Sequence, residues 1–191
     1  DLVEILTGSS SELSQVRRKE AAVAVHQVVT VGDRKVGPGE RPYIIAEAGL
    51  NHNGSLDMGK DLIDAAAEIG CDAIKFQTYK AGKLVVRDAP KYWYDPGDLV
   101  KNQYEMFDGL DRFDEPEWRR LIEKAEEVGI TFMSSAWDEE SVDILDSLSM
   151  VAFKIGSADI TSLPLLRHIA KKGKPVILST GASTVGEIES A

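Results

Sequence analysis

Strand-like and helix-like segments alternate from Tyr43 to the end of this 191-residue chain. Helical patterns with capping signals lie at about 56–69, 115–128, 139–148 and 163–172. The intervening segments have the length and continuous hydrophobicity of strands covered on both faces: YIIAEA, AIKFQT, ITFMSS, VAFKI and PVILST. Because short connections join each helix to the next strand, the pattern predicts a parallel α/β sheet.

Polar residues gather at the C-terminal ends of these predicted strands, whereas the N-terminal ends are apolar or begin with proline. Parallel α/β proteins keep their functional sites at the carboxyl ends of their strands, in barrels and in open sheets alike. The sequence therefore predicts a site at this edge, formed from the following residues: Glu47, Lys75, Gln77, Thr78, Ser134, Ser135, Lys154, Ser157, Ser179 and Thr180.

The number of strands decides between two architectures. We count five, whereas a closed (β/α)8 TIM barrel needs eight. The chain begins at Asp1 rather than Met and stops just after a helix start, so we expect a TIM barrel truncated after about five strands. An open five-stranded sheet is the alternative. It lacks the support of a nucleotide-binding fingerprint, because neither GxGxxG nor GxxxxGK[ST] occurs.

Two segments lie outside the regular repeat. Two short valine-containing runs flank Gly32-Asp33 and predict an N-terminal hairpin with a tight turn. Residues 79–113 form a long excursion after the second strand, of the kind that covers an active site. We accordingly divide the chain into residues 1–27, an extension to which the sequence assigns no role, and residues 28–191, a partial barrel.

Composition excludes several classes of protein. The formal net charge of −10 leaves no basic surplus for a nucleic-acid or membrane-surface binder. No apolar run reaches the roughly 18 residues that a membrane helix needs. The single cysteine, Cys71, excludes an internal disulfide and fits a reducing compartment, so we expect a cytoplasmic protein.

Lys75 and Lys154 are unusual because each lies inside an apolar strand. Two ammonium groups on neighbouring strand ends can bind a small dianion, with Ser/Thr hydroxyls and a glycine-bearing turn as further donors. A strand-end lysine can also form a Schiff base with a carbonyl substrate. In a purely structural role, each lysine would pair with an acid such as Glu47 or Asp159. His52 stands in a loop without the spacing of metal ligands, which favours a loop hydrogen bond over a metal site.

Four blocks in order carry a family resemblance: IIAEAGLNHNGSLDMGKDLIDAAAEIGCDAIKFQT, SSAWDEES, FKIGSADITSLPLL and GKPVILSTGAS. From about Val28 to its end, the chain resembles the sialic acid synthase (N-acetylneuraminate synthase) family. The resemblance implies an eight-stranded (β/α) barrel. It also implies condensation of phosphoenolpyruvate with an N-acetylmannosamine-type sugar to give a nonulosonic acid and phosphate, assisted by Mn²⁺ or Mg²⁺.

The resemblance also assigns roles by position. Lys75 and Lys154 match the lysines that bind phosphoenolpyruvate, and Glu47 matches the active-site glutamate, a candidate acid/base. Gln77 and Asp159 match residues that face the sugar, although some members have Glu in place of Asp159. The hydroxyl donors around the phosphate and carboxylate of phosphoenolpyruvate match Ser135, Ser157 and Ser179.

The family's metal-binding histidines fall beyond Ala191, as does the C-terminal domain that reaches across a homodimer. We therefore expect a homodimer and a metal site only in the full-length protein, and no synthase activity from this chain alone. Two other readings stay open. One is a Schiff-base barrel aldolase that uses Lys75 or Lys154, and the other is a non-catalytic anion-binding module.

Overall fold

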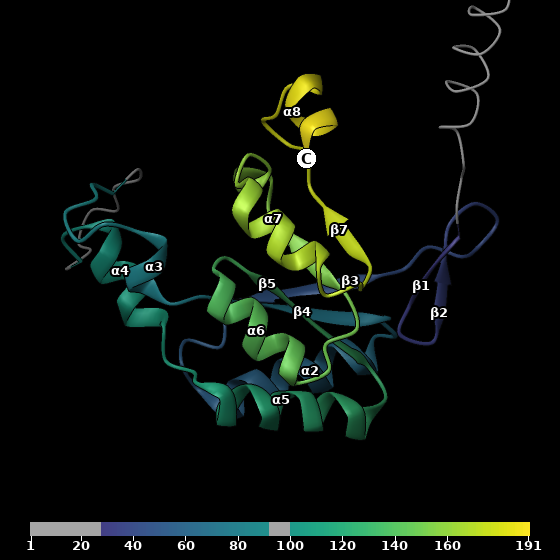
Figure 1. Ribbon diagram of the computed structural model, residues 1–191. Coiled ribbons are helices and arrows are strands. Elements are labelled where there is room, and N and C mark those ends of the chain that lie inside the picture. The colour runs from purple at the N-terminus through teal and green to yellow at the C-terminus, as the bar shows by residue number, and fades with distance from the viewer. Residues whose placement is uncertain (1–27, 92–99) are drawn as a thin grey trace, which may run out of the picture.

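A computed structural model describes residues 28–91 and 100–191 (Figure 1). The extension 1–27 and the part of the excursion at 92–99 lie outside the described residues. The elements are β1 (Val29–Val31), β2 (Arg34–Val36), β3 (Ile45–Gly49), α2 (Leu56–Glu68), β4 (Ala73–Thr78), α3 (Ala81–Leu84), α4 (Gln103–Leu110), α5 (Glu115–Val128), β5 (Thr131–Ala136), α6 (Glu139–Ser147), β6 (Phe153–Ile155), the 3₁₀ helix η1 (Ser157–Asp159), α7 (Leu163–Ala170), β7 (Val176–Leu178) and α8 (Val185–Ser190).

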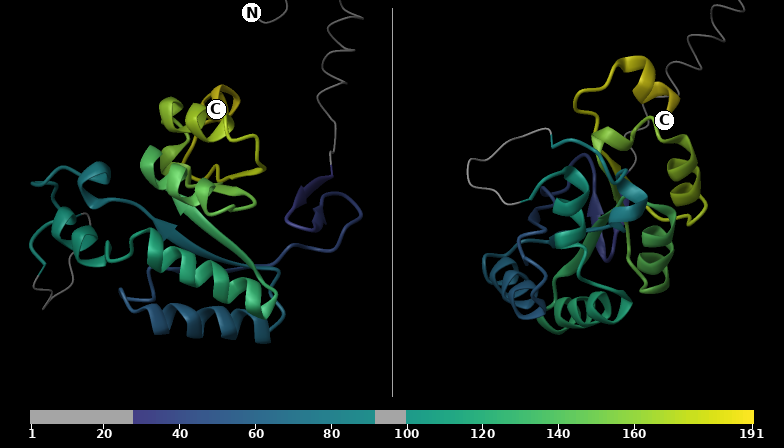
Figure 2. Two further views of the ribbon diagram at one scale, coloured as in Figure 1. Left: turned by 60° about the horizontal axis from the view of Figure 1, so that its bottom comes forward. Right: turned by 90° about the vertical axis from the view of Figure 1, so that its left-hand side faces the viewer.

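The five strands β3 to β7 form one parallel sheet in which each strand lies beside the one before it in sequence. A doubly wound open sheet reverses its strand order and so places helices on both faces. Here the order never reverses, and α2, α5, α6 and α7 follow one another around the outer face of a curved sheet (Figures 1 and 2). The predicted parallel α/β fold is confirmed, and its sequential winding is that of a barrel wall rather than of an open sheet.

Local capping explains where the longer helices begin and end. Asp114 and Glu117 form the predicted capping box at the start of α5, and Gly129 ends that helix in the left-handed conformation with φ +77°. Ser55 caps α2 through the backbone N–H of Met58, at the start that the sequence predicts. Strand β4 coincides with its predicted run AIKFQT. The bounds of the other four strands of the sheet differ from the predicted runs by one or two residues, because several of those runs extend into connecting turns.

The two faces of the sheet bury different side chains. Ile74, Phe76 and Phe132 point outward into the main core beneath the helices, where the rings of Phe76 and Phe132 stack at 5.4 Å between centroids. Alternation along the strands turns Ala73 and Met133 to the inner face, where they pack with Ala152 and with Val31 of the hairpin. The hairpin therefore covers the apolar N-terminal end of the inner face and leaves the C-terminal end to polar residues.

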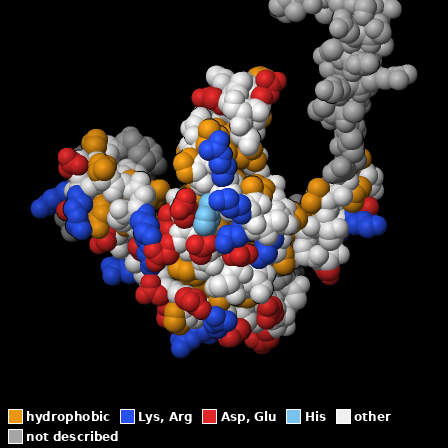
Figure 3. All heavy atoms as spheres, viewed as in Figure 1, with side chains coloured by type: hydrophobic (Ala, Val, Ile, Leu, Met, Phe, Trp, Pro, Cys, Tyr) orange, Lys and Arg blue, Asp and Glu red, His pale blue; other side chains and the backbone are white. Residues whose placement is uncertain are grey.

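The outer surface of the helices carries charges of both signs, interspersed over the face drawn in Figure 3. Between α6 and α7, Asp143 Oδ1 lies 2.7 Å from His168 Nε2 and 2.6 Å from Lys172 Nζ. These contacts hold the pKa of Asp143 below its ordinary value, through the hydrogen bonds from Lys172 and then His168. The Asp143 side chain is about half exposed, so water reaches these ion pairs. We therefore expect them to contribute little to stability.

The predicted hairpin is confirmed and is fastened to the sheet by one carboxylate. β1 and β2 pair in antiparallel register around Gly32-Asp33. Asp72, the residue before β4, forms ion pairs with Arg34 and with Arg41, whose Nη2 lies 2.6 Å from Asp72 Oδ1. Asp72 also accepts a hydrogen bond from the backbone N–H of Ile44 at 2.7 Å. Its side chain is only 5% exposed, so the cluster depends on a buried charge.

Replacing Asp72 by alanine is expected to destabilise the chain by about 3 kcal/mol, because it leaves arginine charges and the Ile44 N–H without their buried acceptor. The free energy of unfolding from urea titration measures the loss. Arg119→Ala is the matched control, since it breaks an exposed pair with Glu115 worth less than about 1 kcal/mol. Equal losses for the two variants would show that Asp72 does not anchor the hairpin.

The described parts of the 79–113 excursion, residues 79–91 and 100–113, contain two helices, α3 and α4, that the sequence analysis did not predict. Each is short: α3 has 4 residues and α4 has 8. Helices of this length have weak periodicity and depend on tertiary contacts for stability. Both lie beyond the C-terminal ends of the strands, on the side where the polar residues gather (Figure 1). In the described parts of the chain, no helix has the length and hydropathy to span a membrane.

Candidate active site

The register of the sheet brings five of the predicted site residues together on its inner face. Thr78 and Ser134 alternate to the outer face instead, where their hydroxyls form a buried hydrogen bond of 2.8 Å, so their predicted place in the site is wrong. Glu47 on β3 stands opposite Lys75 on β4. Two residues further along β4, Gln77 stands opposite Ser135 on β5, which in turn stands opposite Lys154 on β6. These five residues therefore form a polar band across four neighbouring strands, above the apolar layer that the hairpin covers.

Lys75 adopts the ion-paired arrangement that the sequence left open. Its ammonium contacts the carboxylate of Glu47 through Oε2. The lysine side chain is 10% exposed, whereas that of Glu47 is 54% exposed. The strand thus buries the aliphatic stem of Lys75, and the carboxylate of Glu47 remains open to whatever occupies the inner face.

Lys154 has a different environment. Its ammonium donates hydrogen bonds to the backbone carbonyl of Ile155 at 2.6 Å and to Ser179 Oγ at 2.7 Å. Within residues 28–91 and 100–191, it makes no ion pair with an acid. Burial lowers the pKa of Lys154, and the positive charge of Lys75 lowers it further. Of the two lysines, it is therefore Lys154 whose charge, together with its third N–H, is left for a bound anion.

The lowered pKa of Lys154 predicts a pH dependence. As pH rises, the ammonium loses its proton below the ordinary lysine value of 10.5, so anion affinity is expected to fall at a lower pH than an ordinary lysine would allow. Titrating the binding of a small dianion against pH measures this effect. In a Lys154→Arg variant the side chain stays charged, and the fall is expected to move upward. An unchanged profile would exclude Lys154 as the titrating group.

The turn after β6 carries two further predicted residues. Ser157 and Asp159 lie on η1, directly after Gly156. A Cβ at Gly156 would lie 3.3 Å from Asp159 Oδ2 and 3.7 Å from Trp137 Nε1, so glycine allows this turn to pass close to both. Burial raises the pKa of the Asp159 carboxyl, and the charge of Lys154 partly offsets the effect.

Ser157 and Ser179 are not placed alike. Ser179 bonds directly to Lys154, whereas Ser157 faces the next connection, with its Oγ 3.7 Å from where a Cβ at Gly181 would lie. A hollow of about 230 Å³ separates the η1 turn from the β7–α8 connection, and Ser157 and Gly181 both line it. The structure thus joins Lys154 and Ser179 by a hydrogen bond, whereas Ser157 lies beside the connection between β7 and α8, the connection to which Ser179 belongs.

His52 makes the loop hydrogen bond expected of it, but its burial is not evident from the sequence. Its Nδ1 accepts from the Gly54 N–H at 3.1 Å, and its ring is 1% exposed. The ring stacks on Phe113 at 4.4 Å, at the exit of the excursion. Burial lowers the pKa of His52, which keeps it neutral. A polar loop motif such as NHNG gives no sign of the aromatic partner 61 positions away.

The metal that the family resemblance implies does not fit the described residues. Within them, no three or more His, Cys, Asp or Glu side chains come together in a way that could hold a metal ion. His52 is enclosed by Phe113, Trp118 and Phe76 rather than by further ligands. We therefore derive no chemical step through a metal.

Comparison with known proteins agrees with this geometry. The model of the NeuB family matches residues 62–191, which is more than half of the chain. The chain belongs to the NeuB family. The match includes both lysines, Ser135, Ser157, Asp159 and Ser179, and the sialic acid synthase resemblance drawn from the four sequence blocks is confirmed.

Two relatives of this NeuB chain are named as synthases of acidic sugars. The N,N'-diacetyllegionaminic acid synthase of Legionella pneumophila is 44% identical over 151 residues, which make up 78% of this chain and 42% of that protein. The human N-acetylneuraminate-9-phosphate synthase is 37% identical over 148 residues, or 77% of this chain and 41% of that protein.

A solved structure extends the comparison to the fold. The N-acetylneuraminic acid (sialic acid) synthetase of Leptospira borgpetersenii superposes with a TM-score of 0.76 and 31% identity, over 86% of this chain and 53% of that chain. The NeuB chain described here therefore spans about half or less of the length of these three relatives.

Proposed function

We propose that this NeuB chain contributes the phosphoenolpyruvate side of a nonulosonic acid synthase, which condenses phosphoenolpyruvate with an N-acetylmannosamine-type sugar. The observation that carries the proposal is the charge of the inner face. Lys75 and Lys154 stand there together, and among the described residues Lys75 forms an ion pair with an acid, whereas Lys154 does not. A chain with a net charge of −10 thus keeps an unneutralised cation in a half-buried position. An anionic substrate supplies the missing charge.

The hydrogen-bond donors set how phosphoenolpyruvate would lie. Lys154 and Ser179 already contact each other and would bind one anionic end of the substrate, with Lys75 and Ser135 beside them on β4 and β5. We assign Ser157, at the border of the same region, to the remaining phosphate or carboxylate oxygens. Fixed cations around an enol phosphate hold it in place and stabilise the charge that develops during attack.

The chemistry requires a proton donor and a site for the sugar. The C3 carbon of the enol phosphate would attack the aldehyde carbon of the sugar and form the new C–C bond, while the aldehyde oxygen takes up a proton. Water supplies the oxygen at C2, and phosphate leaves. We assign the acid/base role to Glu47, whose carboxylate is accessible on the inner face. Gln77 and Asp159 are assigned to the sugar.

Three further features belong to the proposal. We propose that β3 to β7 are part of an eight-stranded barrel, which their sequential order and one-sided helix cover support. We propose that the full-length protein is a cytoplasmic homodimer. We also propose that it uses Mn²⁺ or Mg²⁺ through ligands outside the described residues.

Product analysis tests the proposed function. The full-length protein, given phosphoenolpyruvate and a divalent metal, is expected to release phosphate and form a nonulosonic acid. The sugars to compare are N-acetylmannosamine, its 6-phosphate and a diacetamido-dideoxy hexose, since the relatives are named for different acids of this class. The 191-residue chain alone is expected to form none. No product from the full-length protein with any of these sugars would refute the proposal.

A Schiff-base aldolase is the second candidate, because a lysine whose pKa is lowered by burial and by a neighbouring cation is a suitable amine nucleophile. Treatment with pyruvate and borohydride separates the two reactions. We expect no stable adduct, since a synthase uses the lysine as a cation rather than as a nucleophile. An adduct on Lys75 or Lys154 would favour the aldolase. Tight binding of phosphoenolpyruvate without turnover by the full-length protein would favour a non-catalytic module.

A further inference from the structure

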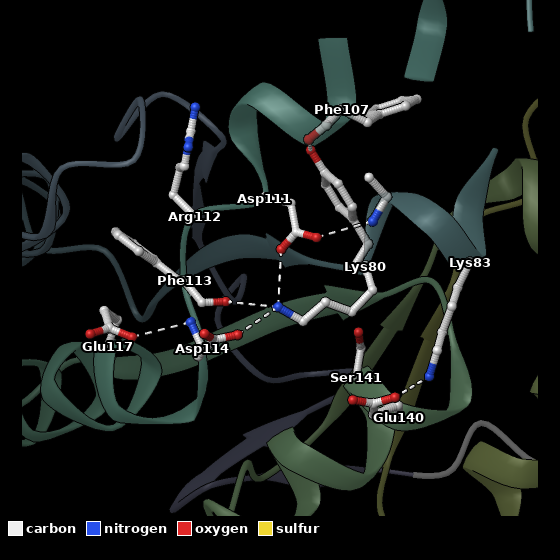
Figure 4. Close-up of polar contacts among 12 residues, drawn as sticks. Lys80, Lys83, Phe107, Asp111, Arg112, Phe113, Asp114, Glu117, Glu140 and Ser141 are labelled. Carbon is white, nitrogen blue, oxygen red and sulfur yellow. Dashed lines mark hydrogen bonds and ion pairs between the residues drawn. The ribbon is translucent and has the colours of Figure 1, made fainter. Parts of the chain in front are cut away.

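One lysine ties the two ends of the 79–113 excursion together. Lys80 is the second residue of the excursion, and its Nζ lies 2.8 Å from Asp114 Oδ1 and 3.1 Å from Asp111 Oδ1 (Figure 4). The same ammonium donates to the backbone carbonyl of Phe113 at 3.4 Å. We call this set of contacts among Lys80, Asp111, Phe113 and Asp114 the Lys80 clip. It joins the excursion's first residues to its last.

The surrounding backbone reinforces the clip. Asp111 also accepts the N–H of Ala81 at 3.1 Å, so both of its carboxylate oxygens face the start of the excursion. The N–H of Lys80 donates to Asp138 Oδ2 at 3.0 Å, and Asp138 caps α6 through the N–H of Ser141. Burial acts to lower the pKa of Lys80, but its bonds to Asp114 and Asp111 outweigh burial and raise it, so the clip stays charged.

Aromatic contacts connect the excursion near the clip to the turn that carries Asp159, one of the two residues assigned to the sugar. The ring of Tyr79 stacks on that of Trp137 at 5.3 Å and meets the edge of Phe107 on α4 at 5.3 Å. The Tyr79 hydroxyl also donates to the Phe107 carbonyl at 3.3 Å. The indole nitrogen of Trp137 in turn lies beside the Gly156 turn that carries Asp159.

The last residues of the excursion lie near Gln77, the other residue assigned to the sugar. A small hollow of about 10 Å³ is lined by Gln77 together with Tyr79 and residues 110–113. Asp111 and Phe113 of the clip belong to this lining. The described parts of the excursion therefore line this hollow together with Gln77, and they reach the Asp159 turn through Trp137. Lys154 lies on β6, two strands from Gln77 on β4, and its partner Ser179 follows β7, three strands from Gln77.

We propose that Lys80 is a positioning residue that holds the 79–113 excursion against the sugar side of the site and so determines affinity for the sugar rather than for phosphoenolpyruvate. This inference rests on the proposed synthase function. Lys80 touches no substrate in this scheme. It acts through Tyr79, Trp137 and the excursion's exit, which border Gln77 and Asp159.

The test compares two lysines three residues apart in the full-length protein. Lys80→Met keeps the aliphatic stem but removes the charge that holds Asp111 and Asp114. Lys83→Met is the matched control. Lys83 on α3 forms an ion pair with the surface residue Glu140 (Figure 4), and among the described residues it forms no other. Both side chains are about half exposed. Lys80→Arg restores a charge at the clip and serves as the rescue variant.

Steady-state kinetics gives the deciding result. Lys80→Met is expected to raise KM for the sugar about tenfold, the equivalent of about 1.4 kcal/mol, and to change KM for phosphoenolpyruvate less than about twofold. Hydrogen exchange at residues 100–113 is expected to accelerate about tenfold, while β4 and β5 stay protected. Lys83→Met should match the wild type in every measurement, and Lys80→Arg should recover most of the sugar KM.

The outcomes separate this inference from the function on which it rests. If the wild type forms product but Lys80→Met leaves the sugar KM unchanged, the positioning role is wrong and the synthase stands. An equal rise in both KM values would mean general damage to the site and would also overturn the proposal. If the wild type forms no product, the proposed function fails. The hydrogen-exchange comparison then still decides whether Lys80 holds the excursion in place.

Discussion

Replacing Lys154 by methionine is expected to lower kcat/KM for phosphoenolpyruvate about a thousandfold in the full-length protein. Methionine keeps the apolar stem that β6 holds, but it removes the ammonium that donates to Ser179 and the Ile155 carbonyl. Truncating one partner of a desolvated, hydrogen-bonded charge pair costs about 4 kcal/mol, and each 1.4 kcal/mol is a factor of ten. The effect should exceed that of most single changes elsewhere in the chain.

Two further variants show whether the charge is responsible for this loss. Lys154→Arg keeps the charge and is expected to retain part of the affinity, although its wider planar head does not fit the same two acceptors. Lys171→Met changes an exposed lysine at the end of α7 and is expected to have no effect on kinetics. If Lys154→Met bound phosphoenolpyruvate as the wild type does, the unneutralised cation would not be the substrate's partner and the proposed function would lose its main support.

The fold and the position of the site were accessible from the sequence because both depend on local patterns. Continuous apolar runs with short helix-to-strand turns indicate parallel strands, and parallel strands bring their carboxyl ends to one edge. Glu47, Lys75 and Lys154 could therefore be placed together from the sequence alone, and the register shows that they share the inner face. The polar residues at the C-terminal ends of the strands were the signal that located the site.

The contacts that these residues make could not be predicted from the sequence, because they depend on distances between residues far apart in the chain, which no local pattern encodes. The sequence offered Glu47 and Asp159 equally as partners for either lysine. In the structure Lys75 contacts Glu47, whereas Lys154 contacts Ser179. The excursion shows the same limit. Its helices are too short for a clear period, and the Lys80 clip joins residues more than 30 positions apart.

Changing Glu47 to glutamine is expected to have opposite effects on binding and on turnover. The substitution preserves shape but removes the carboxylate charge that neutralises Lys75. With two unneutralised cations on the inner face, KM for phosphoenolpyruvate is expected to hold or fall slightly. Loss of a general acid/base lowers the chemical step by about a hundredfold or more, so kcat is expected to fall by about that factor.

This combination separates the two roles that Glu47 can have. As a mere partner of Lys75, it could be replaced without a fall in kcat, because the ammonium would remain in place and would bind the substrate at least as well. As an acid/base, it cannot be replaced by an amide that neither takes up nor releases a proton.

Kinetics with both substrates varied, together with calorimetry of phosphoenolpyruvate binding without sugar, measures each part separately. Glu123→Gln on the exposed face of α5 is the matched control and should match the wild type. A variant at Glu47 that binds more weakly but turns over normally would assign the residue to substrate binding and remove it from the chemical step.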